Sequence, residues 1–263
     1  MTTDSVIISI SRKPAFNLAA EEYLFSQRQD NILFFYINDP CVVIGNNQAI
    51  HAEVNLDYCR IHRIEVMRRL SGGGAVYHDN GNLNFCLIRN REEHTFPLGI
   101  DYLQPVVKLL NDMDIPVETG KRKDLWLNGF KVSGTAAHIG RYRAMHHGTL
   151  LYDANLDHLK NALIAGTLDY DSDGVRVTIP GADSSSPAGA ISSIPSPVLN
   201  LRSYLESKGQ EAMSAPKFFK TIKERFLASD NLPDFTGFTD GEVAAITEIQ
   251  QSVYQKPTWI YKK

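Results

Sequence analysis

Two short segments hold most of the residues that could do chemistry, and the first is RRLSGGGAVYHDNGNLNF (68–85). Three consecutive glycines stand between strand-like runs, where glycine often marks the close approach of backbone to a ligand. Arg69 offers a planar fork of donors, Ser71 a hydroxyl, and the amides after Ser71 can form an anion-binding nest. The segment fits neither the Walker pattern nor GxGxxG. It therefore predicts an anion site of another type.

The second segment is KDLWLNGFKVSGTAAH (123–138), whose Asn128-Gly129 pair is typical of a two-residue hairpin turn. Such a turn predicts four cross-strand pairs: Leu127 with Phe130, Trp126 with Lys131, Leu125 with Val132, and Asp124 with Ser133. Alternation then gives the hairpin one apolar face, made of Leu125, Leu127, Phe130 and Val132. The other face carries Asp124, Trp126, Lys131 and Ser133. Lys131 and Asp124 become diagonal neighbours, about 7 Å apart between backbones. Taken alone, this pattern favours an ordinary solvated face, whose ion pair contributes about 0–1 kcal/mol.

A third segment, MHHGTLLY (145–152), brings two histidines to the start of an expected strand. Neither HExxH nor CxxC accompanies them, so a metal site is disfavoured. We expect His146 and His147 to be packed or hydrogen-bonding residues.

The expected elements are strands joined by short turns, with helices between them. Strands are predicted at 6–10, 31–37, 41–45, 65–70, 83–88, 117–119, 123–128, 130–137 and 146–152. Helices are predicted at 17–29, 55–63, 102–115, 155–165, 199–207, 215–228 and 240–254, with Asn17, Asn55 and Asn155 as N-caps. The pattern favours an α+β fold, with a mostly antiparallel sheet and packed helices. Twelve of the eighteen residues in 180–197 are Ser, Pro or Gly, which predicts a mobile loop.

Composition bounds the function. The 263 residues are 43% hydrophobic and 22% charged, which indicates an ordinary globular protein, and we expect a single domain over 1–263. A net charge of −3 argues mildly against a general nucleic-acid binder. No signal peptide and no run of about 18 apolar residues is found, so no membrane association is expected. The cysteines Cys41, Cys59 and Cys86 form no CxxC pair, so we expect free thiols and a cytoplasmic location.

Together with IGNNQAIHAEVN (44–55), these three segments resemble, in the same order, the lipoate–protein ligase A family. The resemblance runs from the first strand to about residue 165, and more loosely to QKPTWIY near the end. It implies the biotin/lipoyl ligase fold, which is similar to the catalytic domain of class II synthetases. It also implies a two-step reaction. Lipoate and ATP form lipoyl-adenylate and pyrophosphate, and a lysine of a lipoyl domain then takes the lipoyl group.

The resemblance also implies roles for individual residues. Lys131 would lie beside the acyl-phosphate as a catalytic residue, and Asp124 would bind magnesium or position the amine. Substrate or nucleotide binding would fall to Arg69, Ser71, Gly72, Gly73, Gly74, Ala75, Val76, Tyr77, His78, Asn84, Ser133, Gly134, Ala136 and His147. A fixed lysine suits both steps, because negative charge develops first at phosphorus and then on a carbonyl oxygen. The eight-carbon chain needs an apolar tunnel, for which Leu70, Val76 and Phe85 are candidates. Acceptors would be 2-oxoacid dehydrogenase acyltransferases and the glycine cleavage H protein.

Two departures from the family bear on the activation step. Full-length members usually have a small C-terminal accessory domain, which is not expected here. They also carry an arginine-bearing segment like SVRSRVTNL, where this chain has SSIPSPVLNL (192–201) and no Lys or Arg between Arg176 and Arg202. These departures leave open a lipoyltransferase that uses preformed lipoyl-adenylate, or a ligase that needs a separate accessory protein.

Three further alternatives are weaker. Octanoyl transfer from acyl carrier protein would use a cysteine or lysine nucleophile, and no cysteine lies between residue 114 and the Lys131 hairpin. Biotin ligases share the fold, but their glycine-rich loop differs. A non-catalytic paralogue that binds lipoyl domains would have no need of Arg69, the glycines, Asp124 and Lys131 together.

Overall fold

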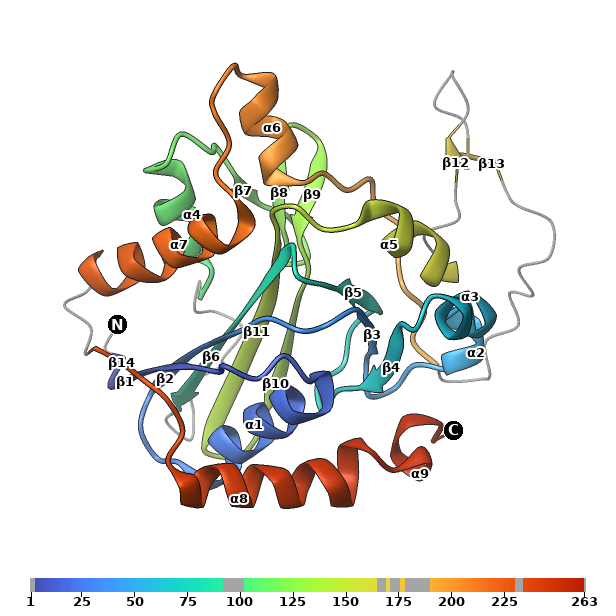
Figure 1. Ribbon diagram of the computed structural model, residues 1–263, viewed down its shortest axis with the longest axis vertical. Helices are drawn as coiled ribbons and strands as arrows, with labels where there is room; N and C mark the ends of the chain where they lie inside the picture. The colour runs from blue at the N-terminus through green and yellow to red at the C-terminus, as the bar shows by residue number, and fades with distance from the viewer. Residues whose placement is uncertain are drawn as a thin grey trace.

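The computed structural model describes residues 3–91, 102–164, 190–229 and 234–262, together with the backbone of two short strands, β12 (Asp169–Tyr170) and β13 (Arg176–Val177). A six-stranded sheet forms its centre, in the order β10-β11-β6-β2-β1-β14 (Figure 1). Its strands are β1 (Ser5–Ile8), β2 (Ile32–Tyr36), β6 (Asn82–Asn90), β10 (Thr135–Ile139), β11 (Arg143–Leu151) and β14 (Phe235–Thr236). The ladder from β10 to β2 is antiparallel, whereas β2, β1 and β14 run parallel.

Two three-stranded sheets flank the main sheet and carry the chemistry. One contains β4 (Glu65–Arg68), β3 (Cys41–Ile44) and β5 (Val76–His78), and the glycine loop joins β4 to β5. The other contains β7 (Glu118–Thr119), β8 (Leu125–Leu127) and β9 (Phe130–Ser133). The hairpin that carries Lys131 is β8–β9, while the glycine loop belongs to a different sheet.

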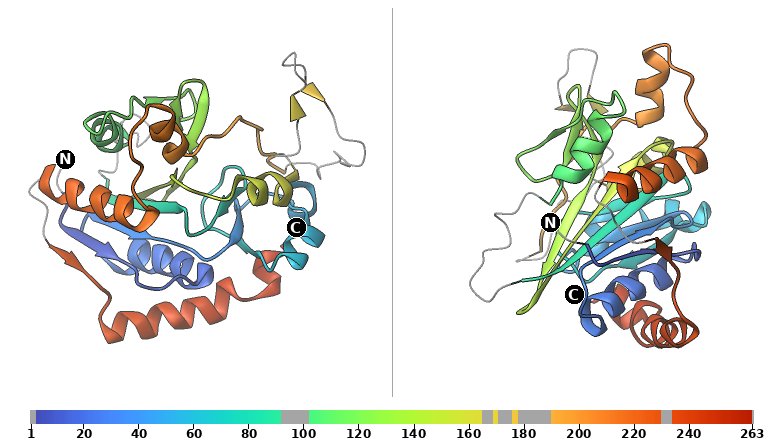
Figure 2. Two further views of the ribbon diagram at one scale, coloured as in Figure 1. Left: turned by 45° about the horizontal axis from the view of Figure 1, so that its top comes forward. Right: turned by 90° about the vertical axis from the view of Figure 1, so that its left-hand side faces the viewer.

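Helices cover both faces of the main sheet (Figure 2). On one face lie α1 (Pro14–Gln27), α8 (Asp240–Ile249) with its π-helical last turn (Gln250–Tyr254), and α9 (Pro257–Ile260). On the other lie α4 (Gln104–Asn111), α6 (Leu201–Ser207) and α7 (Ala215–Ser229). The short helices α2 (Ile50–Glu53), α3 (Leu56–Ile61) and α5 (Leu156–Ala162) pack beside the β4-β3-β5 sheet.

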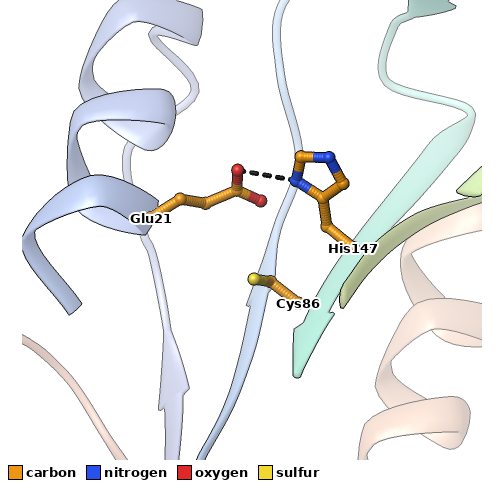
Figure 3. Close-up of side chains that lie close together, drawn as sticks. All are labelled: Glu21, Cys86 and His147. Atoms are coloured by element: carbon orange, nitrogen blue, oxygen red, sulfur yellow. Dashed lines mark hydrogen bonds and ion pairs between the residues drawn. The ribbon is translucent and has the colours of Figure 1, made fainter. Parts of the chain in front are cut away.

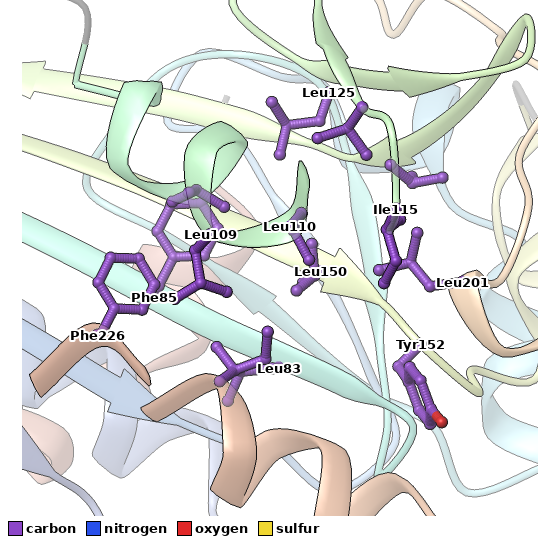
Figure 4. Close-up of a cluster of buried hydrophobic side chains, with 14 of the residues drawn as sticks. Leu83, Phe85, Leu109, Leu110, Ile115, Leu125, Leu150, Tyr152, Leu201 and Phe226 are labelled. Atoms are coloured by element: carbon purple, nitrogen blue, oxygen red, sulfur yellow. The ribbon is translucent and has the colours of Figure 1, made fainter. Parts of the chain in front are cut away.

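The alternation of side chains along the strands explains this two-faced core. Leu33 and Phe35 of β2 join the cluster under α4, α6 and α7 (Figure 4), whereas Phe34 and Tyr36 face α1. Since both faces are covered, β2 and β11 are buried along their whole lengths. The expected α+β class with a mostly antiparallel sheet is confirmed. Among the described residues, no helix has the length and apolar character needed to cross a bilayer.

The element boundaries need three corrections. The first helix begins at Pro14, because the proline fits the first turn, and Asn17 is not its cap. The side chain of Asn17 is buried and donates to Ser11 O and Asn38 Oδ1. Strand 130–137 is two strands in different sheets, and the turn at 79–82 joins two sheets instead of closing a hairpin. Of the expected loop 180–197, residues 180–189 lie outside the described residues, and 190–197 contain no helix or strand.

Candidate active site

A cavity of about 340 Å³ opens where the glycine loop faces strands β9, β10 and β11. A second cavity of about 110 Å³ adjoins it. Both are lined by Ala75, Val76, Lys131, Gly134, Thr149, Ser193 and Ile194. The two cavities thus form one bipartite site, with Lys131 in the wall that they share.

The glycine loop is tightly packed at two of its three glycines. Gly73 has a φ of +87°, which disfavours any side chain, and a Cβ there would lie 3.1 Å from the Arg69 guanidinium. A Cβ on Gly74 would lie 3.0 Å from Ser193 Oγ. Gly72, in contrast, faces open space. The close packing at Gly73 and Gly74 is thus against the protein itself, and the close approach of a ligand to the glycines stays a prediction.

Arg69 holds this loop together. Its Nη2 donates to Gly72 O and Gly74 O at 2.6 and 2.8 Å, and its Nη1 donates to Val43 O at 3.0 Å. Its Nε donates to Ser71 Oγ at 3.0 Å. Burial lowers the pKa of Arg69 to about 10, against the opposing charge of Glu21. The expectation of a free fork for phosphate needs correction, since most of the donors already bind backbone carbonyls.

A buried chain of hydrogen bonds continues from Ser71 to α1. Ser71 Oγ lies 2.7 Å from His147 Nε2, and His147 Nδ1 lies 2.8 Å from Glu21 Oε2 (Figure 3). Tyr36 donates its hydroxyl to Glu21 Oε1 at 2.9 Å. Because the carboxylate only accepts, His147 Nδ1 carries a proton and donates it to Glu21. Each member of the chain is satisfied, with Glu21 as the one negative charge.

Cys86 also lies beside Glu21 and His147, and ligand atoms of the three residues fall within 4.8 Å of one another. Burial and the charge of Glu21 raise the pKa of the Cys86 thiol well above its ordinary value. A protonated thiol is a poor metal ligand. With Glu21 and His147 already hydrogen-bonded, the cluster is a packed polar network, in agreement with the role expected for His147.

His78 presents an unused donor in the cavity. Asn38 Oδ1 accepts from Asn17, so the Asn38 amide nitrogen donates to His78 Nδ1 at 3.1 Å. The proton of neutral His78 is therefore on Nε2, which is buried without a hydrogen-bond partner in the described part of the chain. Burial, followed by the charges of Arg69 and His147, lowers the pKa of His78 to about 3. A neutral imidazole donor is thus available to a bound ligand.

The lysine hairpin forms around the predicted turn, but with a bulge. Asn128 and Gly129 have φ of 50° and 81°, and Trp126 pairs with Lys131 as expected. Leu125 then pairs with Ser133 instead of Val132, because an irregularity lies between Leu125 and Trp126. Ser133 is consequently buried. Phe130, predicted to be in the core, is 42% exposed.

The bulge leaves Asp124 and Lys131 in contact, with Nζ 3.2 Å from Oδ2. Burial raises the pKa of Asp124, but the hydrogen bond from Trp126 and the charge of Lys131 outweigh it, and the pKa lies below its ordinary value. Oδ2 is buried and accepts no well-aligned hydrogen bond. Mg²⁺ prefers carboxylate oxygens, but the nearest cation to Oδ2 is the Lys131 ammonium group, so magnesium at Asp124 stays a prediction.

Residues of the loop 190–197 complete the cavity, although the sequence patterns did not indicate them as site residues. Ser193 Oγ accepts from Ala75 N at 2.8 Å and from Gln48 Nε2 at 3.0 Å, while its own N–H donates to Glu53. Ile191 and Ile194 add apolar surface. Arg122, beside Asp124, and Glu21, which supports the site from behind, were missed as well. No local pattern distinguishes Ser193 from the other serines of its segment.

The predicted site residues fall into three groups. Those lining the larger cavity are Arg69, Gly73, Gly74, Ala75, Val76, His78, Asn84, Asp124, Lys131, Gly134, Ala136 and His147. Tyr77 and Ser133 line only the smaller cavity. Ser71 and Gly72 belong to the loop but line neither. Of the tunnel candidates, Val76 lines both cavities, whereas Leu70 lines neither and Phe85 is buried in the core.

This chain matches known proteins in sequence. The family model of the lipoyl protein ligase A/B catalytic domain matches residues 13–227. Lipoate-protein ligase LplJ of Bacillus subtilis is 33% identical over 253 residues, which cover 94% of this chain and 70% of that protein.

The fold is shared with solved structures of lipoate protein ligases, of which two illustrate the similarity. One is a bi-partite lipoate protein ligase from Thermoplasma acidophilum, determined in a study with its E2 lipoyl domain; it is 21% identical, with a TM-score of 0.77 over 99% of this chain and 97% of that one. The other is a lipoate-protein ligase A bound with ATP, also 21% identical, with a TM-score of 0.77 over 99% of both chains. The family model and the Bacillus relative together show that the chain belongs to the lipoyl protein ligase A/B catalytic domain family.

Proposed function

We propose that this chain is a lipoate–protein ligase that activates lipoate with ATP and transfers the lipoyl group to a lysine of a lipoyl domain. The observation that carries the proposal is the bipartite cavity with Lys131 in its shared wall. A two-part ligand such as an acyl-adenylate needs two adjoining compartments and a cation where they meet. The larger compartment, about 340 Å³, falls within the size range of small-molecule sites.

In the first step, a carboxylate oxygen of lipoate attacks the α-phosphorus of ATP. The bond to the β-phosphate breaks, and pyrophosphate leaves with the electron pair. Lys131 Nζ lies in the wall between the compartments, where its charge can stabilise the phosphoryl oxygens. The ion pair with buried Asp124 orients the ammonium group. When bound at Asp124, magnesium would neutralise phosphate charge.

In the second step, the ε-amine of the acceptor lysine attacks the carbonyl carbon of the mixed anhydride. AMP leaves with the bonding electrons, and the new amide nitrogen loses a proton. Lys131 can stabilise the developing carbonyl oxyanion, and His78, which lines the same larger cavity, offers an unused Nε2–H donor. The chain needs no nucleophilic side chain of its own, since the acceptor protein brings the amine.

The acceptors we propose are the lipoyl domains of 2-oxoacid dehydrogenase acyltransferases and the glycine cleavage H protein. The archaeal structural relative, studied with its E2 lipoyl domain, supports an acceptor of this class. A cytoplasmic location stays a prediction. The described structure has Cys41, Cys59 and Cys86 as buried free thiols, which is consistent with it.

A transferase that uses only preformed lipoyl-adenylate, or a ligase that depends on a separate accessory protein, is the second candidate. It is favoured by the stretch 192–201, which lines the cavity with Ser192 and Ser193 and has no cation. A non-catalytic paralogue is disfavoured, because the Asp124–Lys131 pair remains intact.

Mass spectrometry of a purified lipoyl domain separates these functions. We expect lipoylation with lipoate, ATP and magnesium and without any other protein. Lipoylation from synthetic lipoyl-adenylate alone would instead support the transferase. An unmodified domain in both reactions would refute both activities.

A further inference from the structure

Among the cations that line the larger cavity, Arg122 is the one that makes no hydrogen bond or ion pair within the described chain. The larger cavity is lined by three Lys or Arg residues, Arg69, Arg122 and Lys131. Arg69 donates to the glycine loop, and Lys131 pairs with Asp124. Among the described residues, the Arg122 guanidinium has neither a hydrogen bond nor an ion pair. It therefore keeps all its donors for a ligand.

The turn that carries Arg122 is well braced. Gly120 N donates to Asp124 O at 2.7 Å, and Lys123 N donates to Gly120 O at 3.0 Å. Lys123 takes a left-handed φ of 62°, and Thr135 Oγ1 donates to its carbonyl at 2.6 Å. The backbone of this turn is thus tied to Asp124 on one side and to β10 on the other. These hydrogen bonds fix the backbone position of Arg122 beside the cavity, although its side chain is exposed.

The activation step needs such a cation. When the bond to the β-phosphate breaks, negative charge accumulates on the departing pyrophosphate, and a guanidinium fork matches phosphate oxygens in bidentate fashion. The stretch 192–201, whose first three residues line the cavity, has no Lys or Arg. Arg122 lines the same cavity as Asp124 and Lys131, so it could act on the same triphosphate.

We propose that Arg122 binds the β- and γ-phosphates of the nucleoside triphosphate and stabilises the leaving pyrophosphate. The inference rests on the proposed ligase function. It assigns Arg122 to one of the two steps of that function. Arg122 acts in activation, where pyrophosphate is released, and has no task in the transfer step, where AMP leaves.

Lys121 provides the matched control. It is exposed on the same turn and carries the same charge, but it does not line either cavity. If the basic run 121–123 only attracted anions through its long-range field, Lys121→Ala and Arg122→Ala would weaken binding alike. A fitted phosphate site instead requires a loss specific to Arg122→Ala, with partial retention in Arg122→Lys.

The test measures binding of inorganic pyrophosphate to the full chain by calorimetry, with magnesium present. We expect Arg122→Ala to raise Kd at least tenfold, Arg122→Lys to raise it less, and Lys121→Ala to change it by less than twofold. Failure of the wild type to bind pyrophosphate would overturn the proposal, as would equal affinity of wild type and Arg122→Ala. This readout does not depend on ligation.

The two half-reactions supply the second measurement. Lipoylation from lipoate and ATP should fall at least tenfold in Arg122→Ala, while transfer from synthetic lipoyl-adenylate stays within twofold of wild type. An equal fall in both reactions would contradict a role confined to activation. If the wild type catalyses neither reaction, the ligase function fails, and the pyrophosphate titration still decides whether Arg122 forms an anion site.

Discussion

Replacing Glu21 by Gln tests whether the buried chain behind the cavity supports the glycine loop. Glu21 is 2% exposed and accepts from Tyr36 and His147. Gln keeps the shape but removes the charge, and its amide nitrogen cannot accept. Either the His147 proton or the Tyr36 proton then loses its acceptor. The chain to Ser71 and Arg69 loses its only negative charge.

The cost can be worked from these contacts. A hydrogen bond to a charged group contributes about 1.5–3 kcal/mol, and an unsatisfied buried donor costs about 1–3 kcal/mol. Since relaxation recovers part of the loss, we expect the free energy of unfolding to fall by about 2–4 kcal/mol. Urea unfolding measures this through a lower midpoint at unchanged m-value. In the folded variant, we also expect lipoylation to fall at least tenfold, because Ser71 and Arg69 position the loop.

Glu22→Gln is the control on the same helix. Glu22 is half-buried and accepts one hydrogen bond, from the Tyr254 hydroxyl at 2.8 Å, so about 1 kcal/mol or less should be lost. Lipoylation should stay within twofold of wild type. Equal destabilisation by the two variants, or a loss below about 0.5 kcal/mol for Glu21→Gln, would refute the reasoning.

Three further predictions concern the loop, the lysine and pH. Gly73→Ala should reduce lipoylation at least tenfold, because φ is +87° and the Cβ meets the Arg69 guanidinium, whereas Gly72→Ala, facing open space, should have little effect; similar rates in the two variants would contradict the packing argument. Lys131→Ala should abolish lipoylation of a lipoyl domain and leave circular dichroism unchanged, and near-normal activity would exclude the proposed chemistry. Burial lowers the pKa of His78 to about 3 and that of His146 to about 4, so the unfolded chain binds more protons below pH 6.5. Stability in urea should therefore decrease from pH 6.5 towards pH 4, by up to about 2.7 kcal/mol per pH unit from these two histidines. His146→Phe should reduce this slope, and an unchanged slope in that variant would contradict the assignment.

Local sequence was enough where neighbouring residues decide the structure. Asn128-Gly129 forms the predicted turn, and Asp124 and Lys131 meet across it. Asn55 and Asn155 cap their helices as expected, accepting from the backbone N–H groups three residues on. Short connections between strands indicated a mostly antiparallel α+β fold. In each case the interacting groups lie within a few residues, so turn chemistry and side-chain periodicity determine them.

Tertiary structure decided the parts of the site that depend on distant segments. Arg69, Ser71 and His147 were recognised as site residues, but their hydrogen bonds were not, because Glu21 lies 126 residues from His147. Ser193 reaches Ala75 across 118 residues, and one bulge in the hairpin changes the partner of Leu125 and buries Ser133. A sequence pattern records which groups are available. Which donor meets which acceptor depends on how the sheets pack. In the described part of the chain, that packing uses Arg69 to hold the glycine loop and leaves the Arg122 guanidinium at the cavity without a hydrogen bond or ion pair.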